Sequence, residues 1–240
     1  MNIDSILDAL FPRGHAVTVA DQVIAGEATT AAGTVTVLGT TDAAAIDHRI
    51  ALTLARRVID TAELHPGRPI VFLVDTSGQA LSRQQELLGL NGSLAHLAQC
   101  VDAARRRGHP ILSLVTANAV SGGFLSFGLM ADRVYALADA QVRVMDLKAM
   151  ARVTKIDHER LVALAASSPI FAPGADNYQR MGAIEAIWDR PDAARLDSAL
   201  AELAAAPRGE DRRMALGWER GGRSLAAATA AAVMAAPPAA

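Results

Sequence analysis

Two short segments of small and polar residues carry most of the chemistry that this sequence offers. Residues 75–79 (DTSGQ) end one apolar run, and residues 118–123 (NAVSGG) end the next. Glycine lets backbone N–H groups approach a ligand without a Cβ in the way, and a helix N-terminus adds unpaired N–H donors. Two such segments side by side could aim two N–H groups at one oxygen, as in an oxyanion hole. The alternative is two ordinary turns that bind nothing.

Ser121 could instead be a nucleophile at the start of a helix. Such a serine needs a base, usually a histidine that an acid orients. The chain has six histidines: His15, His48, His65, His96, His109 and His158. Four of them fall inside predicted helices or at the opposite end of the predicted sheet, and His15 and His158 have no recognisable setting. The Gly-x-Ser-x-Gly elbow spacing is also missing, so the sequence favours a capping or packing role for Ser121.

Carboxylates could act as a general acid or base. The candidates are Asp75, Glu86, Asp132 and Asp146. No two of them have a spacing that demands a paired role, and we expect Asp75 to order its own loop through Asx-type hydrogen bonds. The sequence has no metal-ligand constellation and no Gly-Lys-Ser/Thr phosphate loop. It therefore predicts no metal site on this chain.

The two segments must be positioned by the strands that precede them. Continuous apolar runs at 69–76 and 110–116 predict strands buried on both faces. Helical stripes between and around them give the order strand, helix, strand, helix, strand. That order favours an α/β fold with a largely parallel sheet. In such sheets ligands gather at the carboxyl ends of the strands, where both segments lie.

The surrounding elements follow from apolar periodicity. A stripe predicts a helix over 42–64 that begins at Thr41 or Asp42, and another predicts a long helix over 82–107. The remaining predicted elements are strands at 16–20, 34–40, 133–137 and 141–145, and helices at 1–12, 122–131, 157–166, 176–187 and 193–206.

Composition narrows the class of protein. The chain has 240 residues, 51% hydrophobic and 20% charged, with no internal repeat or clear linker. We expect one domain over 1–240, with an N-terminal helix over 1–12 and an Ala/Pro-rich, frayed tail over 224–240. A net charge of −2 argues against a nucleic-acid partner. No signal peptide and no strongly apolar run of membrane-spanning length is present, so we expect no membrane association and a cytoplasmic location.

Several longer segments resemble a known family. Residues 74–99 and 116–137 are similar to the carboxyltransferase branch of the crotonase superfamily, in which Asp-Thr-Pro-Gly ends one strand and a Ser-Gly-Gly turn ends the next. The segments SRQQELLGLNG, AVSGGFL, MADRVYAL and VRVMDLKAMARVTKI are closer still to gamma subunits of biotin-independent malonate decarboxylases. The resemblance covers roughly residues 15–190.

This resemblance implies both a fold and an activity. The fold would be crotonase-like, built from stacked β-β-α units. The chain would act with a homologous beta subunit as a carboxy-lyase, active only within the complex. The substrate would be malonate held as a thioester on the CoA-like prosthetic arm of an acyl carrier protein. The products would be CO2 and the acetyl thioester, with no cofactor bound by this chain.

The resemblance also implies which residues form the site. The catalytic groups would be backbone N–H groups near Gly78, Gln79, Gly122 and Gly123. The residues that would meet the substrate are Thr76, Ser77, Ser121 and Phe124. By analogy, the partner would hold the enolate oxygen of the thioester and this chain would face the carboxyl group. Two departures from the family pattern are Ser77 in place of proline and Asn118-Ala119-Val120 in place of a glycine-rich run.

Two other hypotheses stay open. A ring-forming serine hydrolase of the caseinolytic type shares the fold and would use Ser121, but it expects a histidine about two dozen residues later, where Met145-Asp146-Leu147 stands. A non-catalytic scaffold subunit would only dock the carrier protein.

Overall fold

One mixed sheet organises the molecule. The computed structural model describes residues 1–167, 172–207, 209–222 and 224–236. Within them a nine-stranded sheet has the order β1-β2-β3-β5-β6-β7-β9, and β4 and β8 pair with β5 and β6. The β1-β2 and β2-β3 pairs are antiparallel, and the other pairs are parallel. The predicted α/β fold with a largely parallel sheet is therefore confirmed.

The bounds of the elements are as follows. The strands are β1 (His15–Ala20), β2 (Val23–Thr30), β3 (Gly33–Thr40), β4 (Ala44–Ile46), β5 (Ile70–Gln79), β6 (Ile111–Val120), β7 (Arg133–Leu137), β8 (Gln141–Arg143) and β9 (Ala186–Trp188). The helices are α1 (Ile3–Leu10), α2 (His48–Leu64), α3 (Arg83–Leu87), α4 (Leu90–Arg106), α5 (Ser121–Leu125), α6 (Leu147–Thr154), α7 (His158–Ser167), α8 (Ala175–Arg180), α9 (Ala193–Ala205), α10 (Arg213–Glu219) and α11 (Ser224–Ala235).

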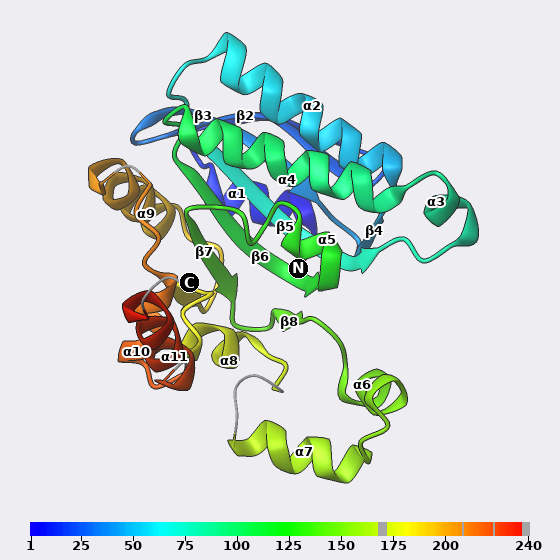
Figure 1. Ribbon diagram of the computed structural model, residues 1–240. Coiled ribbons are helices and arrows are strands. Elements are labelled where there is room, and N and C mark those ends of the chain that lie inside the picture. Colours follow the sequence, from blue (N-terminus) through cyan, green and yellow to red (C-terminus); the bar gives the residue numbers. More distant parts are fainter. Residues whose placement is uncertain (168–171, 208, 223, 237–240) are drawn as a thin grey trace.

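Helices cover both faces of the sheet and bury two apolar clusters. Figure 1 shows α2 and α4 side by side over one face, where their apolar stripes pack on β5 and β6 around Phe72 and Phe127. The other face is covered by α1 and α9, which pack around Leu7 and Leu196. β5 and β6 lie between these layers, which explains why their sequences are continuously apolar.

The carboxyl ends of β5 and β6 exchange their outer neighbours within the sheet. Residues 70–73 of β5 pair with β3, but beyond a register shift between Val74 and Thr76 the strand pairs with β4 instead. In the same way, β6 pairs first with β7 and then, over 118–120, with β8. The last residues of both strands therefore have flanking strands of their own, and α5 packs against them (Figure 1).

The predicted helix over 42–64 begins later than expected. Asp47 caps α2 by accepting from the Ile50 N–H at 2.8 Å, so neither Thr41 nor Asp42 is the cap. Residues 44–46 form β4 because pairing with the end of β5 satisfies their backbone groups. Periodicity misses this because Ile46 fits the four-residue apolar spacing of the predicted helix, although it is buried as part of β4.

The predicted helix over 82–107 is broken in two. Gly89 has a φ of +75°, which ends the first piece, α3, and starts the second, α4. Ser82 caps α3 as expected, but Leu87 points outward and is 76% exposed. The break turns α3 into a short exposed helix beside the ends of β4 and β5 (Figure 1).

The C-terminal half differs most from prediction. The helix predicted over 122–131 is only the short α5, and that over 176–187 is α8 followed by β9. In this half the sequence did not predict α6 or α10, and near the N-terminus it did not predict β2. The tail, expected to fray, forms α11 over 224–235, while 237–240 lie outside the described residues. The assignment of all of 1–240 to one domain stays a prediction.

Candidate active site

The two predicted ligand segments meet, but as strand ends and not as loops. Residues 75–79 complete β5, and residues 118–120 complete β6 before α5 begins at Ser121. Thr76 lies opposite Ala119 in the parallel pair. A Cβ added to Gly78 would lie 3.4 Å from the Val120 carbonyl oxygen and 3.6 Å from the Ser121 Cβ. The prediction that both segments lie side by side at one end of the sheet is confirmed.

Asp75 ties three segments together at this point. One carboxylate oxygen accepts from the backbone N–H and the side-chain amide of Asn118, both at 3.0 Å, and the other accepts from the Ala43 N–H at 2.9 Å. The residue is 9% exposed. Asp75 therefore orders the start of β4 and the end of β6, and the prediction that it orders its own segment through Asx-type bonds is wrong.

Thr76 is fully buried and uses its hydroxyl inside the protein. The hydroxyl donates to the Ala44 carbonyl oxygen at 2.7 Å and accepts from the Gly78 N–H at 3.1 Å. Gly78 itself has a φ of +110°, which favours glycine. The Gly78 N–H is thus already bonded within the strand end.

The Gly122 N–H has a side-chain partner. It donates to Oε1 of Gln79 at 3.1 Å, so the Gln79 carboxamide caps the first turn of α5. Ser121, just before it, has a φ of +45°, a left-handed conformation that is uncommon for a residue with a Cβ. The turn from β6 into α5 is therefore strained and is held from the side of β5.

Gly123 is a glycine because α5 packs directly on β5. A Cβ at this position would lie 2.6 Å from the Thr76 Oγ1 and 2.8 Å from the carbonyl carbon and oxygen of Gly78. Contacts that short force backbone to move. The absence of a side chain at Gly123 therefore serves the helix–strand contact, whatever its N–H does.

The predicted substrate-contact residues fall into two groups. Ser77 is exposed, and Ser121 is half-buried beside Gly78. Phe124 is 1% exposed and packs against Gly128 in the core, as Thr76 does against β4. Only Ser77 and Ser121 of the four can meet a ligand without a rearrangement.

The histidines leave Ser121 without a base. His48 bonds to Ser93 and to the Gln85 carbonyl, and His109 bonds to the Arg68 carbonyl. His15, His65 and His96 lie near Asp8, Glu27 and Cys100, respectively. Among the described residues, which include all six histidines, none is hydrogen-bonded to the Ser121 hydroxyl, so a serine–histidine pair is not formed.

Sequence reasoning missed an apolar surface beside the site. Leu81, Leu87 and Leu88 in and around α3 are 83%, 76% and 64% exposed, and Leu125 of α5 is 40% exposed. Leu87 belongs to an apolar stripe when residues 82–107 are read as one long helix, and the break at Gly89 separates it from the rest of that stripe.

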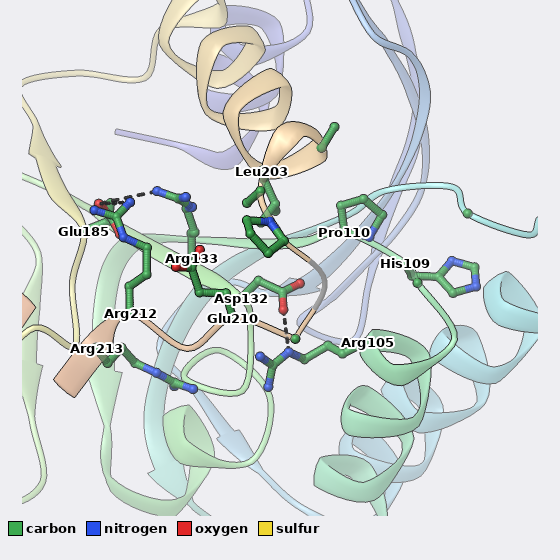
Figure 2. Close-up of a pocket in the computed structure, with 16 residues that line it drawn as sticks. Arg105, His109, Pro110, Asp132, Arg133, Glu185, Leu203, Glu210, Arg212 and Arg213 are labelled. Atoms are coloured by element: carbon green, nitrogen blue, oxygen red, sulfur yellow. Dashed lines mark hydrogen bonds and ion pairs between the residues drawn. The ribbon is translucent and has the colours of Figure 1, made fainter. Parts of the chain in front are cut away.

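A pocket lies at the other end of the sheet. Figure 2 shows a pocket of about 240 Å³ around the first residues of β6 and β7 and the α9–α10 connection. Arg105 binds Asp132 at 2.7 Å, and Asp132 also accepts from the Ile111 N–H at 2.8 Å. Glu185 lies 3.5 Å from Arg133 and 3.8 Å from Arg212. The arginines of this pocket thus face carboxylates of the protein itself.

Burial and nearby charges also shift the pKa of Tyr135, which lies near this pocket. Desolvation, together with the nearby Glu185 carboxylate, raises the pKa of Tyr135 to about 12, while Arg133 opposes the shift. Tyr135 packs on Trp188 at a ring separation of 4.9 Å.

Among the described residues, no three His, Cys, Asp or Glu side chains come together as a metal-ligand set. Nor is any described helix long and apolar enough to cross a membrane.

Known proteins similar to this chain are carboxyltransferases and decarboxylases. A protein of Malonomonas rubra, malonyl-S-ACP:biotin-protein carboxyltransferase MADD, is 36% identical over 172 residues, which cover 66% of this chain and 58% of that protein. The acetyl-coenzyme A carboxylase carboxyl transferase subunits beta/alpha of Saccharopolyspora erythraea are 30% identical over 57% of this chain and 23% of theirs. The chain therefore spans little more than half the length of the first relative and about a quarter of the second.

Solved structures match over nearly the whole chain. A chain of a Pseudomonas malonate decarboxylase hetero-tetramer in complex with coenzyme A superposes with a TM-score of 0.79 and 26% identity, covering 95% of this chain and 96% of that one. A chain of the Pseudomonas MdcD-MdcE hetero-dimer gives 0.75 and 25%, with the same coverage. The fold is that of crotonase-like carboxyltransferases. The family model of the malonate decarboxylase gamma subunit matches residues 41–237, and the chain belongs to that family.

Proposed function

We propose that this chain works with a homologous beta subunit to decarboxylate a malonyl thioester on an acyl carrier protein. The product is the acetyl thioester, and the reaction takes place at the ends of β5 and β6. The observation that carries the proposal is the meeting of both segments there, with the Gly122 N–H at the start of α5 and Asp75 holding the segments together. The family assignment supplies the substrate class.

The chemistry needs backbone donors and no side-chain nucleophile. The bond from the carboxyl carbon to the methylene carbon breaks, its electron pair enters the thioester as an enolate, and CO2 leaves. The enolate carbon then takes a proton. Charge moves from the carboxyl group to the thioester oxygen, so donors at that oxygen lower the barrier. Losing one such donor typically costs about 10²–10³ in rate.

Each subunit binds a different end of the substrate. We assign the thioester oxygen to the partner's oxyanion hole and the carboxyl group to this chain, through N–H groups of Gln79 and Gly123. The Gly78 N–H is bonded to Thr76 and the Gly122 N–H to the Gln79 carboxamide, so these two groups have supporting roles. Ser77 and Ser121 line the approach, whereas the buried Thr76 and Phe124 position the strand end and α5.

The exposed leucines around α3 support the need for partners. Monomeric proteins rarely leave contiguous apolar side chains in water unless a partner covers them. Leu81 and Leu125 lie two and three residues from Gln79 and Gly122, and together with Leu87 and Leu88 they are exposed, so a second subunit or the carrier protein would cover them. The Pseudomonas relatives were solved as a hetero-dimer and a hetero-tetramer, one of them with coenzyme A. A cytoplasmic location and a carrier-borne prosthetic arm belong to the same proposal.

Reconstitution tests the proposal. The chain alone should release no CO2 from malonyl–carrier protein, and the equimolar mixture with the beta subunit should do so, with acetyl–carrier protein as the product. Full activity of the lone chain would contradict a site shared by two subunits. Labelling of Ser121 by a fluorophosphonate probe would instead favour the hydrolase. Full activity in complexes altered at both strand ends would leave this chain as a scaffold.

A further inference from the structure

The Gln79 carboxamide has a fixed orientation with its donor end free. The Gly122 N–H can only donate, so the atom that faces it at 3.1 Å must be the carboxamide oxygen. Nε2 is therefore turned away from α5. Among the described residues Nε2 has no hydrogen-bond partner, and the only buried side-chain polar atom without a partner there is Ser113 Oγ. Nε2 thus reaches solvent at the site.

We propose that Gln79 Nε2 binds an oxygen of the substrate's carboxyl group, the one that leaves as CO2. The inference rests on the proposed function and adds a side-chain donor to the backbone donors assigned there. The neighbours of Gln79 fit this role, because the Gly122 N–H prevents the carboxamide from turning its oxygen outward. The site would recognise a carboxylate next to a thioester.

A neutral donor suits a carboxyl group that must depart. Negative charge leaves the carboxyl oxygens as the carbon–carbon bond breaks, so any group that holds that charge stabilises the substrate more than the transition state. An arginine or lysine would form a stronger ion pair and raise the barrier accordingly. A carboxamide orients the carboxylate at a smaller cost. We therefore expect Gln79 to act mainly on substrate binding and orientation.

Gln79→Glu in the reconstituted complex tests the inference. The new side chain keeps its shape and can still accept from the Gly122 N–H, but it places a negative charge where Nε2 donated. The specificity constant for malonyl–carrier protein should fall about 100-fold, mostly through KM, since a hydrogen-bond donor to the carboxylate is replaced by a group of like charge. Gln79→Ala removes the donor without adding charge and should cost about tenfold.

Gln85→Glu is the matched control. Gln85 Oε1 also accepts a backbone N–H, that of His48, at 3.1 Å, but at the start of α2. The same substitution there should change turnover less than about threefold. Co-purification with the beta subunit reports whether each variant is folded and assembled.

Product binding separates a substrate contact from a structural role. Acetyl–carrier protein lacks the carboxyl group, so its affinity for the complex should be nearly unchanged in Gln79→Glu. Equal losses for malonyl and acetyl carriers would mean that Gln79 only supports α5, and wild-type kinetics in Gln79→Glu would also overturn the inference. If the wild-type complex itself failed to decarboxylate malonyl–carrier protein, the proposed function would fall first.

Discussion

The two ends of β6 show opposite uses of polar groups. At its carboxyl end the chain has glycines, serines and the carboxamides of Asn118 and Gln79, of which only that of Gln79 has a donor without a protein partner among the described residues. At its amino end, around the pocket of Figure 2, Arg105 and Arg133 face Asp132 and Glu185 within the protein. The first end leaves hydrogen-bonding capacity for a ligand, whereas the second uses its charges to join the C-terminal segment to the sheet.

Two aspartates with similar hydrogen bonds, one at each end of β6, allow the two ends to be compared directly. Asp75 accepts the Asn118 N–H near the carboxyl end of β6, and Asp132 accepts the Ile111 N–H at its amino end. Both carboxylates are largely buried and each holds a second group, Ala43 for Asp75 and Arg105 for Asp132. The two aspartates have similar structural roles, but Asp75 lies at the candidate site whereas Asp132 lines the pocket of Figure 2.

Replacing each aspartate by alanine should give the largest effects. Both Asp75→Ala and Asp132→Ala leave donors unpaired and should lower the free energy of unfolding by about 3 kcal/mol, measured by urea denaturation. Turnover per folded complex should fall about 100-fold in Asp75→Ala, because misplacement of reacting groups by about 1 Å costs that much. In Asp132→Ala it should stay within about threefold. Equal losses of turnover would remove the functional distinction between the two ends.

The next largest difference should be in the stability of alanine variants at the adjacent positions Gly122 and Gly123. Gly123→Ala puts a Cβ 2.8 Å from the Gly78 backbone and should cost about 2 kcal/mol of stability. Gly122→Ala puts a Cβ 3.0 Å from Oε1 of Gln79 and 3.7 Å from Cδ1 of Leu94, which are side-chain atoms and not backbone, and should cost less than half as much. Thermal unfolding of the two variants measures the difference. If Gly123→Ala were as stable as Gly122→Ala, the direct packing of α5 on β5 would be wrong.

The smallest effect should come from Tyr135, near the pocket at the amino end of β6, and should be seen as a loss of stability at high pH. Tyr135 has a pKa of about 12 in the folded protein and about 10 when unfolded, so its neutral form favours folding. This contribution is complete below pH 10 and is lost as the pH rises through 12. Tyr135→Phe should therefore lose less stability than wild type between pH 9 and 11.5, by on the order of 1 kcal/mol after solvent screening. Parallel pH profiles of urea midpoints would contradict the shifted pKa, and turnover near neutral pH should be the same in both proteins.

Most of the central fold was predictable because its signals are local. Apolar runs identify β5 and β6, and α9 and β7 fall where periodicity places them. The short elements β4, α5 and β9 were missed or misjudged, since a segment of three to five residues gains its stability from neighbours distant in sequence. The break at Gly89 had a signal, a glycine within a helical stripe, which alone does not distinguish a tolerated glycine from a helix end.

The sequence by itself determined that two small-residue segments end neighbouring buried strands, and its motifs indicated the family. Only the tertiary structure decided which atoms those segments offer. It assigned the Gly78 N–H to Thr76, the Gly122 N–H to the Gln79 carboxamide, and the bare Cα of Gly123 to packing on β5. The physical reason is that a hydrogen bond depends on distance and direction between groups far apart in the chain, whereas strand and helix patterns depend on residues that are close together.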